Sequence, residues 1–296
     1  MGRRVSLRRM RAVIAGDVHG NVDHVRFLME VCRDVDASFL VVVGDFGFWP
    51  HYDWGVDFLE FVEAEAQFSD VFVLWIDGNH DNHDVLDHKR ESLLDDDLTV
   101  ISPHVFHVPR GCRFELGALR CVGFGGALSV DASHRREGDT WWSQELVSRG
   151  QIDRLRERVE HPDWDGRAID VLFTHEAPLA SGMRAPAHHG VDELSYKDVI
   201  SESLAQRRLI SEVTDLLRPS VQFCGHHHVR RTFERTFGDG STCEVQVLGR
   251  DSMGADSYVV LDCGDAPYDW AADFDFAFEE VDEVVGEDDW GDDWDV

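Results

Sequence analysis

Residues 10–20 read Met-Arg-Ala-Val-Ile-Ala-Gly-Asp-Val-His-Gly, an apolar run that ends in a polar turn. The run from Val13 to Ala15 has the short, continuous apolar character of a strand that is buried on both faces. Gly16 permits a sharp bend directly after this strand. The turn then presents Asp17 and His19 with a single residue between them. This stretch therefore predicts a buried strand with two metal-binding side-chain types at its carboxyl end.

Four later apolar runs, at residues 39–43, 71–76, 171–173 and 221–223, repeat this design. They are followed by Gly44-Asp45, Gly78-Asn79-His80-Asp81, Thr174-His175 and Gly225-His226-His227-His228. Residues 21–36 carry apolar side chains at helical spacing, and Asn21 is a suitable N-cap. A similar pattern at residues 58–68 precedes the third run. Strand and helix in alternation predict βαβ units in a mostly parallel sheet.

In an open α/β sheet, ligands gather beyond the carboxyl ends of the strands. Five such strands would bring two Asp, one Asn and at least four His to one rim. Imidazole nitrogen and carboxylate oxygen together bind transition metals such as Mn, Fe and Zn. A carboxylate can bridge two metal ions, and Asp45 is the natural bridge because it is the single Asp at its strand end. His227 lies between two candidate ligands and is expected to point away by alternation.

The motifs D-x-H, G-D, G-N-H-D, H and G-H-x-H occur here in that order, and the chain thereby resembles the calcineurin-like metallophosphoesterase family. The resemblance runs from Val13 to His228, with trailing strands to about Cys263. It implies an α/β fold, a two-sheet αββα sandwich of the metallo-dependent phosphatase type. The resemblance implies that Asp17, His19 and His228 bind one metal ion. It implies that Asn79, His175 and His226 bind a second metal ion and that Asp45 bridges the two ions.

The resemblance also implies the chemistry. Two divalent metal ions, with Mn²⁺ expected and Fe or Zn as alternatives, would bridge a hydroxide that attacks phosphorus in line. His80 would not bind metal, but would contact the phosphate and protonate or stabilise the leaving oxygen. The second motif departs from the protein Ser/Thr phosphatases, because Gly44-Asp45-Phe46-Gly47-Phe48-Trp49 lacks their second Asp and their Arg. The usual Asp partner of the catalytic His therefore has no obvious counterpart, and Asp81 is only its neighbour in sequence.

Substrate recognition is expected in the segment from Gly123 to Trp142. Arg135 and Arg136 stand out in so acidic a chain, because Arg binds phosphate bidentately. The alternative is that this loop is structural and that its arginines pair with nearby acids. Trp141 and Trp142 would either stack on a base or pack the loop. His188 and His189 are further candidates for substrate contact, and Asp139 and Glu145 are expected to be solvated.

The distribution of charged residues and of the motifs divides the chain into three parts. Residues 1–9 are expected to be a basic N-terminal extension, residues 10–264 the metallophosphoesterase domain, and residues 265–296 an acidic, disordered tail. The tail contains 14 Asp or Glu and no Lys or Arg. Strands are expected at residues 99–108, 113–124, 244–248 and 257–261, forming a second sheet packed on the first. Helices are expected at residues 151–159 and 201–217.

Composition limits the function further. The net charge of −30 disfavours binding to duplex nucleic acid, which needs a basic surface. No apolar run is long enough to span a bilayer, and the six cysteines contain no C-x-x-C pair, which favours a reducing, cytoplasmic setting. A small phosphoester or nucleotide is the expected substrate. A nuclease on single-stranded or terminal nucleic acid and a catalytically silent scaffold are the alternatives. The sequence does not define the substrate, the ester class, the native metals or the oligomeric state.

Overall fold

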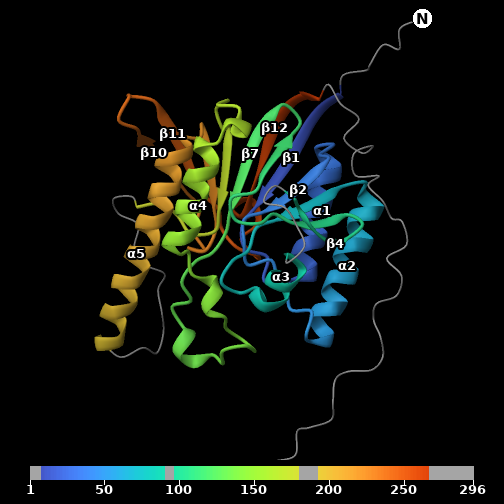
Figure 1. Cartoon of the computed structure of the whole chain (residues 1–296). Helices are drawn as coiled ribbons and strands as arrows, with labels where there is room; N and C mark the ends of the chain where they lie inside the picture. Colours follow the sequence, from blue (N-terminus) through green and yellow to red (C-terminus); the bar gives the residue numbers. More distant parts are fainter. Residues whose placement is uncertain (1–7, 91–96, 180–192, 267–296) are drawn as a thin grey trace, which may run out of the picture.

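A computed structural model describes residues 8–90, 97–179 and 193–266 of the chain. The two six-stranded sheets lie in the middle of the molecule, with helices on both outer sides (Figure 1). Nearly all of the N-terminal extension and the acidic tail, together with His188 and His189, lies outside the described residues. No helix within the described residues is both long enough and apolar enough to cross a membrane. The predicted two-sheet αββα sandwich is confirmed.

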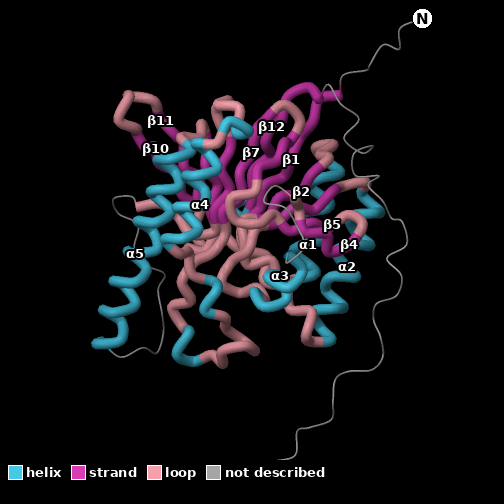
Figure 2. The backbone as a smooth tube through the Cα atoms, viewed as in Figure 1, coloured by secondary structure: helices cyan, strands magenta, loops and turns pink. Residues whose placement is uncertain are grey.

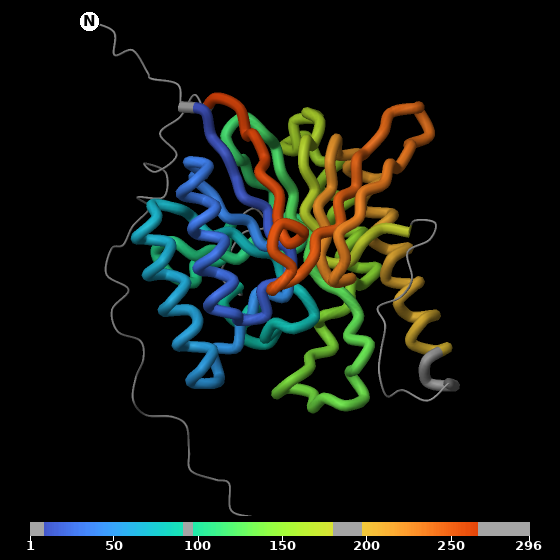
Figure 3. Tube along the Cα trace, turned by 180° about the vertical axis from the view of Figure 1, so that it is seen from behind, coloured from blue at the N-terminus to red at the C-terminus, as the bar shows by residue number. Residues whose placement is uncertain are grey.

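The first sheet has the strand order β12-β1-β2-β3-β5-β4. Its strands are β12 (Tyr258–Ala266), β1 (Arg8–Ala15), β2 (Phe39–Val42), β3 (Phe72–Trp75), β5 (Val105–His107) and β4 (Thr99–Ser102). The four central strands are parallel, whereas β12 and β4 pair antiparallel at the two edges. Figure 3 shows β12, in red, running beside β1, in dark blue, so the end of the domain returns to its beginning.

The second sheet has the order β10-β11-β9-β8-β7-β6. Its strands are β10 (Arg231–Thr236), β11 (Thr242–Val247), β9 (Val221–Cys224), β8 (Val171–Thr174), β7 (Leu119–Phe124) and β6 (Arg113–Leu116). Again the four central strands are parallel and the two edge strands antiparallel. Both sheets therefore present the carboxyl ends of several parallel strands, and loops gather below these ends in Figure 2.

The helices cover the two outer faces. They are α1 (Val22–Asp34), α2 (Asp53–Ser69), α3 (His83–Arg90), α4 (Arg149–Glu160) and α5 (Glu193–Leu217). Short 3-10 helices lie at Ala132–His134 (η1), Ser143–Glu145 (η2), Pro162–Trp164 (η3) and Gly254–Ser257 (η4). As predicted, the Asn21 side chain caps α1, because it accepts hydrogen bonds from the backbone N–H groups of Asp23 and His24. Ser148 caps α4 in a capping box with Gln151.

Three apolar layers separate the helices and sheets. Along β1, Val13 and Ala15 pack into the layer under α1 and α2. The alternate residues Ala12 and Ile14 pack into the layer between the sheets. A third layer lies between the second sheet and the helices α4 and α5. Because a strand's side chains alternate between its two faces, a strand that is covered on both sides must be apolar throughout. That is why β2 and β3 read as unbroken apolar runs.

The division of strands between the sheets differs from the sequence prediction. Residues 99–108 and 257–261 belong to the first sheet rather than the second, and residues 171–173 and 221–223 belong to the second rather than the first. Residues 99–108 and 113–124 each form an antiparallel hairpin instead of one strand. β1 begins at Arg8 and β12 ends at Ala266, so both strands extend two residues beyond the predicted domain. Hydrophobic pattern marks a buried strand, but it does not specify which neighbour that strand pairs with.

Candidate metal centre

The seven predicted ligands follow five parallel strands, and the two sheets contribute different subsets. The first sheet supplies the four residues that follow β1, β2 and β3: Asp17, His19, Asp45 and Asn79. The second sheet supplies His175 after β8 and both His226 and His228 after β9. The site therefore lies where the carboxyl ends of the two sheets meet. Its formation depends on sheet packing as well as on strand order.

The ligand atoms form two groups that share one carboxylate. Asp17, His19, Asp45 and His228 form the first group, and Asp45, His175 and His226 form the second, with all ligand atoms of a group within 4.8 Å of one another. The Asn79 Oδ1 atom is 3.1 Å from His175 Nε2, so this amide lies beside the second group. The first group contains the three residues that the resemblance assigned to one metal, and the second contains two of the three assigned to the other, with Asn79 beside them. Asp45 is the residue that both groups have in common.

Close contacts within each group fit a cation between the side chains. The Nε2 atoms of His19 and His228 are 3.2 Å apart, and His228 Nε2 is 3.0 Å from Asp17 Oδ2. In the second group, His175 Nε2 is 3.2 Å from Asp45 Oδ1. The Nε2 atom of His226 is buried and has no hydrogen-bond partner among the described residues. An unsatisfied buried imidazole beside carboxylates is a suitable ligand for a divalent metal ion.

The electrostatics of the two groups also favour cations. Burial acts to raise the pKa of Asp45, but the neighbouring His175 and His80 hold it well below its usual range. Burial acts to lower the pKa of His175, but the Asp45 and Asp17 carboxylates more than offset this and raise it to about 10. Both carboxylates therefore remain ionised at neutral pH. A metal ion would compete with a proton for this imidazole.

Four of the seven ligands have a left-handed backbone, with φ values of 54° at His19, 46° at Asp45, 64° at His226 and 53° at His228. Such a conformation is unfavourable for a residue with a Cβ, by about 1–2 kcal/mol each. The turns are held by tertiary hydrogen bonds, such as the 2.7 Å bond that the His19 N–H donates to the Asp45 carbonyl. Strain maintained in this way is typical of a functional site.

Two glycines allow the ligand turns to approach one another. A Cβ added at Gly78 would lie 2.2 Å from Asp45 Oδ1, and one added at Gly225 would lie 2.2 Å from Asp17 Oδ1. Both contacts are far shorter than van der Waals distance. Neither glycine has a positive φ, so these positions require glycine for space rather than for backbone freedom.

His80 lies beside the first group but belongs to neither. Its backbone N–H donates to Asp45 Oδ1 at 2.8 Å, and its ring is 5.3 Å from that of His19. Its Nε2 accepts a hydrogen bond of 2.7 Å from the Arg135 guanidinium, which also pairs with Asp131. Burial lowers the pKa of His80 to about 4. The side chain that orients this histidine is therefore an arginine held by an aspartate.

Asp81 uses its carboxylate to bind backbone N–H groups rather than the His80 ring. Its carboxylate accepts hydrogen bonds from the backbone N–H groups of Gly47, Phe48 and Gly78. Burial and the nearby Asp45 charge raise the pKa of Asp81 to about 7 despite these bonds. Asp81 thus ties the turn after β2 to the turn after β3. This is the structural reason why an acid follows His80.

The two predicted substrate arginines have different environments. Arg135 is mostly buried and contacts His80, as described above. Arg136 is exposed, and it is held through its backbone bonds with Thr140. Trp142 is buried and packs against Trp49, so it belongs to the structure of the loop.

Two buried acids near the ligands were not recognised from sequence. Glu145, expected to be solvated, is fully buried; that expectation was wrong because Glu145 accepts bonds from the N–H and hydroxyl of Ser129. Ser129 in turn accepts a bond from the Asn79 amide. Glu176 is also fully buried and contacts His227 at 2.7 Å and His226 at 3.8 Å. The sequence signal for Glu176 was its position directly after His175.

An aromatic cluster borders the metal centre. Trp49, Tyr52 and Trp54 lie within 6.2 Å of one another, measured between ring centroids. Trp54 is 51% exposed. Its ring would lie 3.5 Å from a Cβ added at Gly20, the residue that follows His19. We call these three residues the aromatic platform.

Comparison with known proteins agrees with this fold. The sequence profile described as calcineurin-like phosphoesterase matches residues 10–230. A dimetal phosphatase from Danio rerio is similar in structure, with a TM-score of 0.52, 14% identity and coverage of 86% of this chain and 93% of that one. A protein from Thermus thermophilus gives a TM-score of 0.51 at 10% identity, with coverage of 86% of this chain and 100% of that one. No curated protein sequence matches this chain. The profile match spans most of the chain and all seven ligands, and the chain belongs to the calcineurin-like phosphoesterase family.

Proposed function

We propose that the protein is a metal-dependent phosphoesterase that hydrolyses a phosphate mono- or diester, with a small molecule or nucleotide as substrate. The observation that carries this proposal is the pair of ligand groups that share Asp45 beside His80. Family membership supports it, since the family typically binds two divalent metals, and the similar Danio rerio protein is described as a dimetal phosphatase. Mn²⁺ is the metal we expect, with Fe or Zn as alternatives, because the ligands are imidazoles, carboxylates and one amide.

Two divalent ions, when bound, would make a water nucleophilic at neutral pH and neutralise charge on the phosphoryl oxygens. The protein's own residues would do the rest. His80 would contact the phosphate and stabilise or protonate the leaving oxygen. Arg135 would hold His80 in place and contact the phosphate, whereas the exposed Arg136 is less well placed. Glu145, through Ser129, would fix the orientation of the Asn79 amide.

The aromatic platform supports a substrate with a flat ring, such as a nucleotide. A base can stack on an exposed indole, and each such stack is worth about 1–3 kcal/mol. The net charge of −30 disfavours a long polyanion, which supports a mononucleotide over an extended nucleic acid. All six cysteines are free and buried, which supports a reducing compartment such as the cytoplasm.

One experiment tests the proposed function. Protein reconstituted with Mn²⁺ would be assayed in parallel on a generic aryl phosphate monoester and the matching diester. We expect hydrolysis of at least one ester that disappears after chelation and returns when metal is added. If both esters stay intact while two metals are bound, the proposal is wrong for general phosphoesters and the scaffold alternative gains support.

Trp54→Ala tests the platform. Loss of one stacking surface should raise the KM for a nucleotide by about 5- to 160-fold, as expected for about 1–3 kcal/mol. The KM for glycerol phosphate, or for an aliphatic diester if the enzyme prefers diesters, should stay unchanged. Phe68→Ala is the matched control, since Phe68 is an exposed aromatic at the far end of the same helix. Equal effects on the two substrates would show that Trp54 has no role in base recognition.

A further inference from the structure

The two ligand groups differ in the number of carboxylates that they contain. The first group has two, Asp17 and Asp45, whereas the second has only Asp45, which it shares with the first. The other members of the second group are imidazoles, and the Asn79 amide beside them is neutral. We call the metal ions of the two groups the first ion and the second ion. The second ion would therefore have to share the only carboxylate of its group with the first ion.

Glu176 places a further carboxylate beside the second group. It follows His175, directly after β8, and its side chain is fully buried. The Glu176 Oε2 atom is 3.8 Å from His226 Nε2, which is too long for a hydrogen bond. Both atoms are buried, and neither has a hydrogen-bond partner among the described residues. A carboxylate oxygen and an imidazole nitrogen that are buried in this way fit a cation close to both.

The other oxygen of the carboxylate holds Glu176 in this position. The Oε1 atom accepts hydrogen bonds from the Ala177 N–H at 2.8 Å and from His227 Nε2 at 2.7 Å. His227 lies between the ligands His226 and His228 in the sequence. Glu176 therefore ties the ligand turn after β8 to the ligand turn after β9. This contact gives a role to the histidine that separates the two ligands.

The Glu176 carboxylate is charged although it is buried. Burial acts to raise its pKa, but the neighbouring His227 and His226 more than offset this and hold the pKa at about 2. Arg207, on α5, also lowers the pKa, although less than the two histidines do. Glu176 therefore places a negative charge next to the second group at neutral pH.

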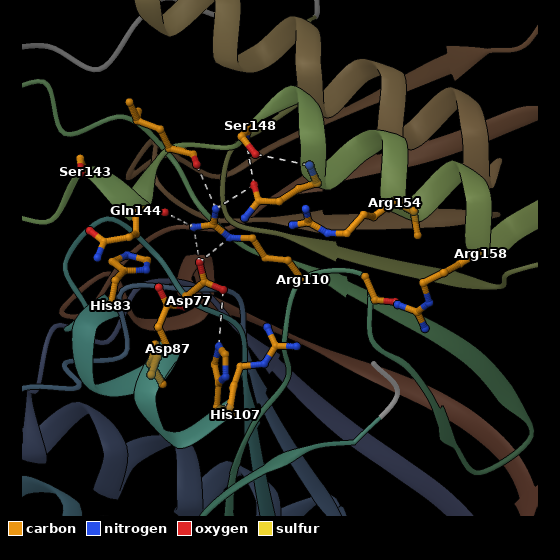
Figure 4. A pocket seen from close by; sticks show the side chains of 16 residues that line it. Asp77, His83, Asp87, His107, Arg110, Ser143, Gln144, Ser148, Arg154 and Arg158 are labelled. Carbon is orange, nitrogen blue, oxygen red and sulfur yellow. Dashed lines mark hydrogen bonds and ion pairs between the residues drawn. The ribbon is translucent and has the colours of Figure 1, made fainter. Parts of the chain in front are cut away.

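Asp77, another buried acid near the ligands, has a different environment (Figure 4). Its Oδ2 atom accepts hydrogen bonds from Arg110 Nε and Nη2, at 2.9 and 2.6 Å. Its Oδ1 atom lies 3.4 Å from His107 Nε2. The Arg110 guanidinium thus offsets the Asp77 charge directly, by two hydrogen bonds to one carboxylate oxygen. Glu176, whose Oε2 atom faces a candidate ligand, is the acid whose charge can act on a metal ion.

We propose that Glu176 is the charge partner of the second ion, a buried anion beside His226 that strengthens the binding of a divalent cation there. Glu176 lies outside the second group itself, so its role is to supply charge and to position the turns rather than to act as a ligand. Groups that adjoin metal ligands in this way typically contribute about 10–100-fold to metal affinity. The inference rests on the metal centre of the proposed function, but it does not depend on which ester is hydrolysed.

The test measures metal affinity rather than activity. Metal-free, full-length protein is titrated with Mn²⁺, and the free Mn²⁺ is followed by electron paramagnetic resonance. Wild type should bind two ions. Glu176→Gln removes the charge but keeps the shape, and we expect it to bind one ion with near wild-type affinity and the other about 10- to 100-fold more weakly. Glu176→Asp keeps the charge farther from His226, so it should weaken the same ion less than Glu176→Gln does.

Two backgrounds identify which ion is weakened. His19→Ala removes a ligand of the first group, and His226→Ala removes one of the second. Adding Glu176→Gln should weaken the ion that remains in the His19→Ala background, which is the second ion. It should leave the remaining ion unchanged in the His226→Ala background, which is the first ion. The reverse pattern would assign Glu176 to the wrong ion and overturn the proposal.

Glu63→Gln is the matched control. Glu63 also accepts hydrogen bonds from a histidine ring and a backbone N–H, but both belong to His104, at the β4–β5 hairpin. This variant therefore loses the same kind of glutamate–histidine pair away from the ligand turns. It should bind both ions with wild-type affinity. Weakening by Glu63→Gln equal to that by Glu176→Gln would show that the effect is not specific to the metal centre.

Three further results would overturn the proposal: a wild type that binds fewer than two ions, wild-type affinity for both ions in Glu176→Gln, and equal weakening of both ions in that variant. Thermal unfolding in chelator shows whether each variant is folded. If Glu176→Gln is unfolded, Glu176→Asp decides, because weakening of one ion alone supports the proposal and any other result contradicts it. A wild type that binds two ions but hydrolyses neither aryl ester would contradict the proposed function and leave this inference intact.

Discussion

Asp45→Asn is expected to lose both metal ions and nearly all activity. Asp45 is the one carboxylate common to both ligand groups, and it is fully ionised and buried. Asparagine keeps the shape but removes the negative charge that offsets two cations. We expect metal content to fall from two ions to fewer than one per chain, measured by inductively coupled plasma mass spectrometry after desalting. Turnover should fall by more than ~10⁴-fold, since the ions supply several kcal/mol and each 1.36 kcal/mol is tenfold.

Asp57→Asn is the control for this change, because Asp57 is exposed on α2 and the substitution has the same chemistry. It should keep two metals and full activity. Thermal unfolding of both variants in chelator separates metal loss from misfolding. If Asp45→Asn retains two tightly bound metals, Asp45 does not bridge them and the two-metal assignment must be revised.

His80→Ala is expected to retain both metals and to lose turnover. His80 contacts the ligand groups only through its backbone N–H and ring edge, so its removal leaves the ligands in place. A positioned acid–base group typically contributes about 10²–10⁴-fold to the rate. We expect a loss of that size in kcat, with metal content near two ions per chain.

Arg135→Gln extends this test. Because Arg135 orients His80, its removal should lower kcat less than the loss of His80 itself. The loss of its phosphate contact should appear in KM, so the kcat of the double variant should be no lower than that of His80→Ala alone. His134→Ala, a neighbouring exposed histidine, serves as the control and should behave as wild type. Full activity in His80→Ala would remove this histidine from the mechanism, and additive losses in the double variant would give Arg135 a separate role.

Several features of the site were predictable because they depend on local sequence. Each buried strand needs apolar side chains on both faces, and each parallel strand ends at the same edge as its neighbours. Asp17, Asp45 and Asn79 could therefore be placed at one rim, because each follows one of three neighbouring parallel strands of the first sheet. The cap of α1 at Asn21 followed from a hydrogen bond between near neighbours in the chain.

Other features depend on contacts between distant segments. The partner of His80 is Arg135, 55 residues away, although Asp81 is adjacent in sequence. Glu145 was expected to be solvated, because nothing in its local sequence shows that Ser129 will meet it in the interior.

The sequence by itself determined which strands are buried, which polar residues end them, and which Asp, Asn and His residues are candidate metal ligands. The tertiary structure alone decided how those strand ends are shared between two sheets, and so which ligands form each group around Asp45. It also decided what orients His80. The physical reason is the distance along the chain over which each kind of interaction acts. Side-chain alternation and capping act over a few residues, whereas sheet pairing and buried ion pairs are selected by the packing of the whole domain.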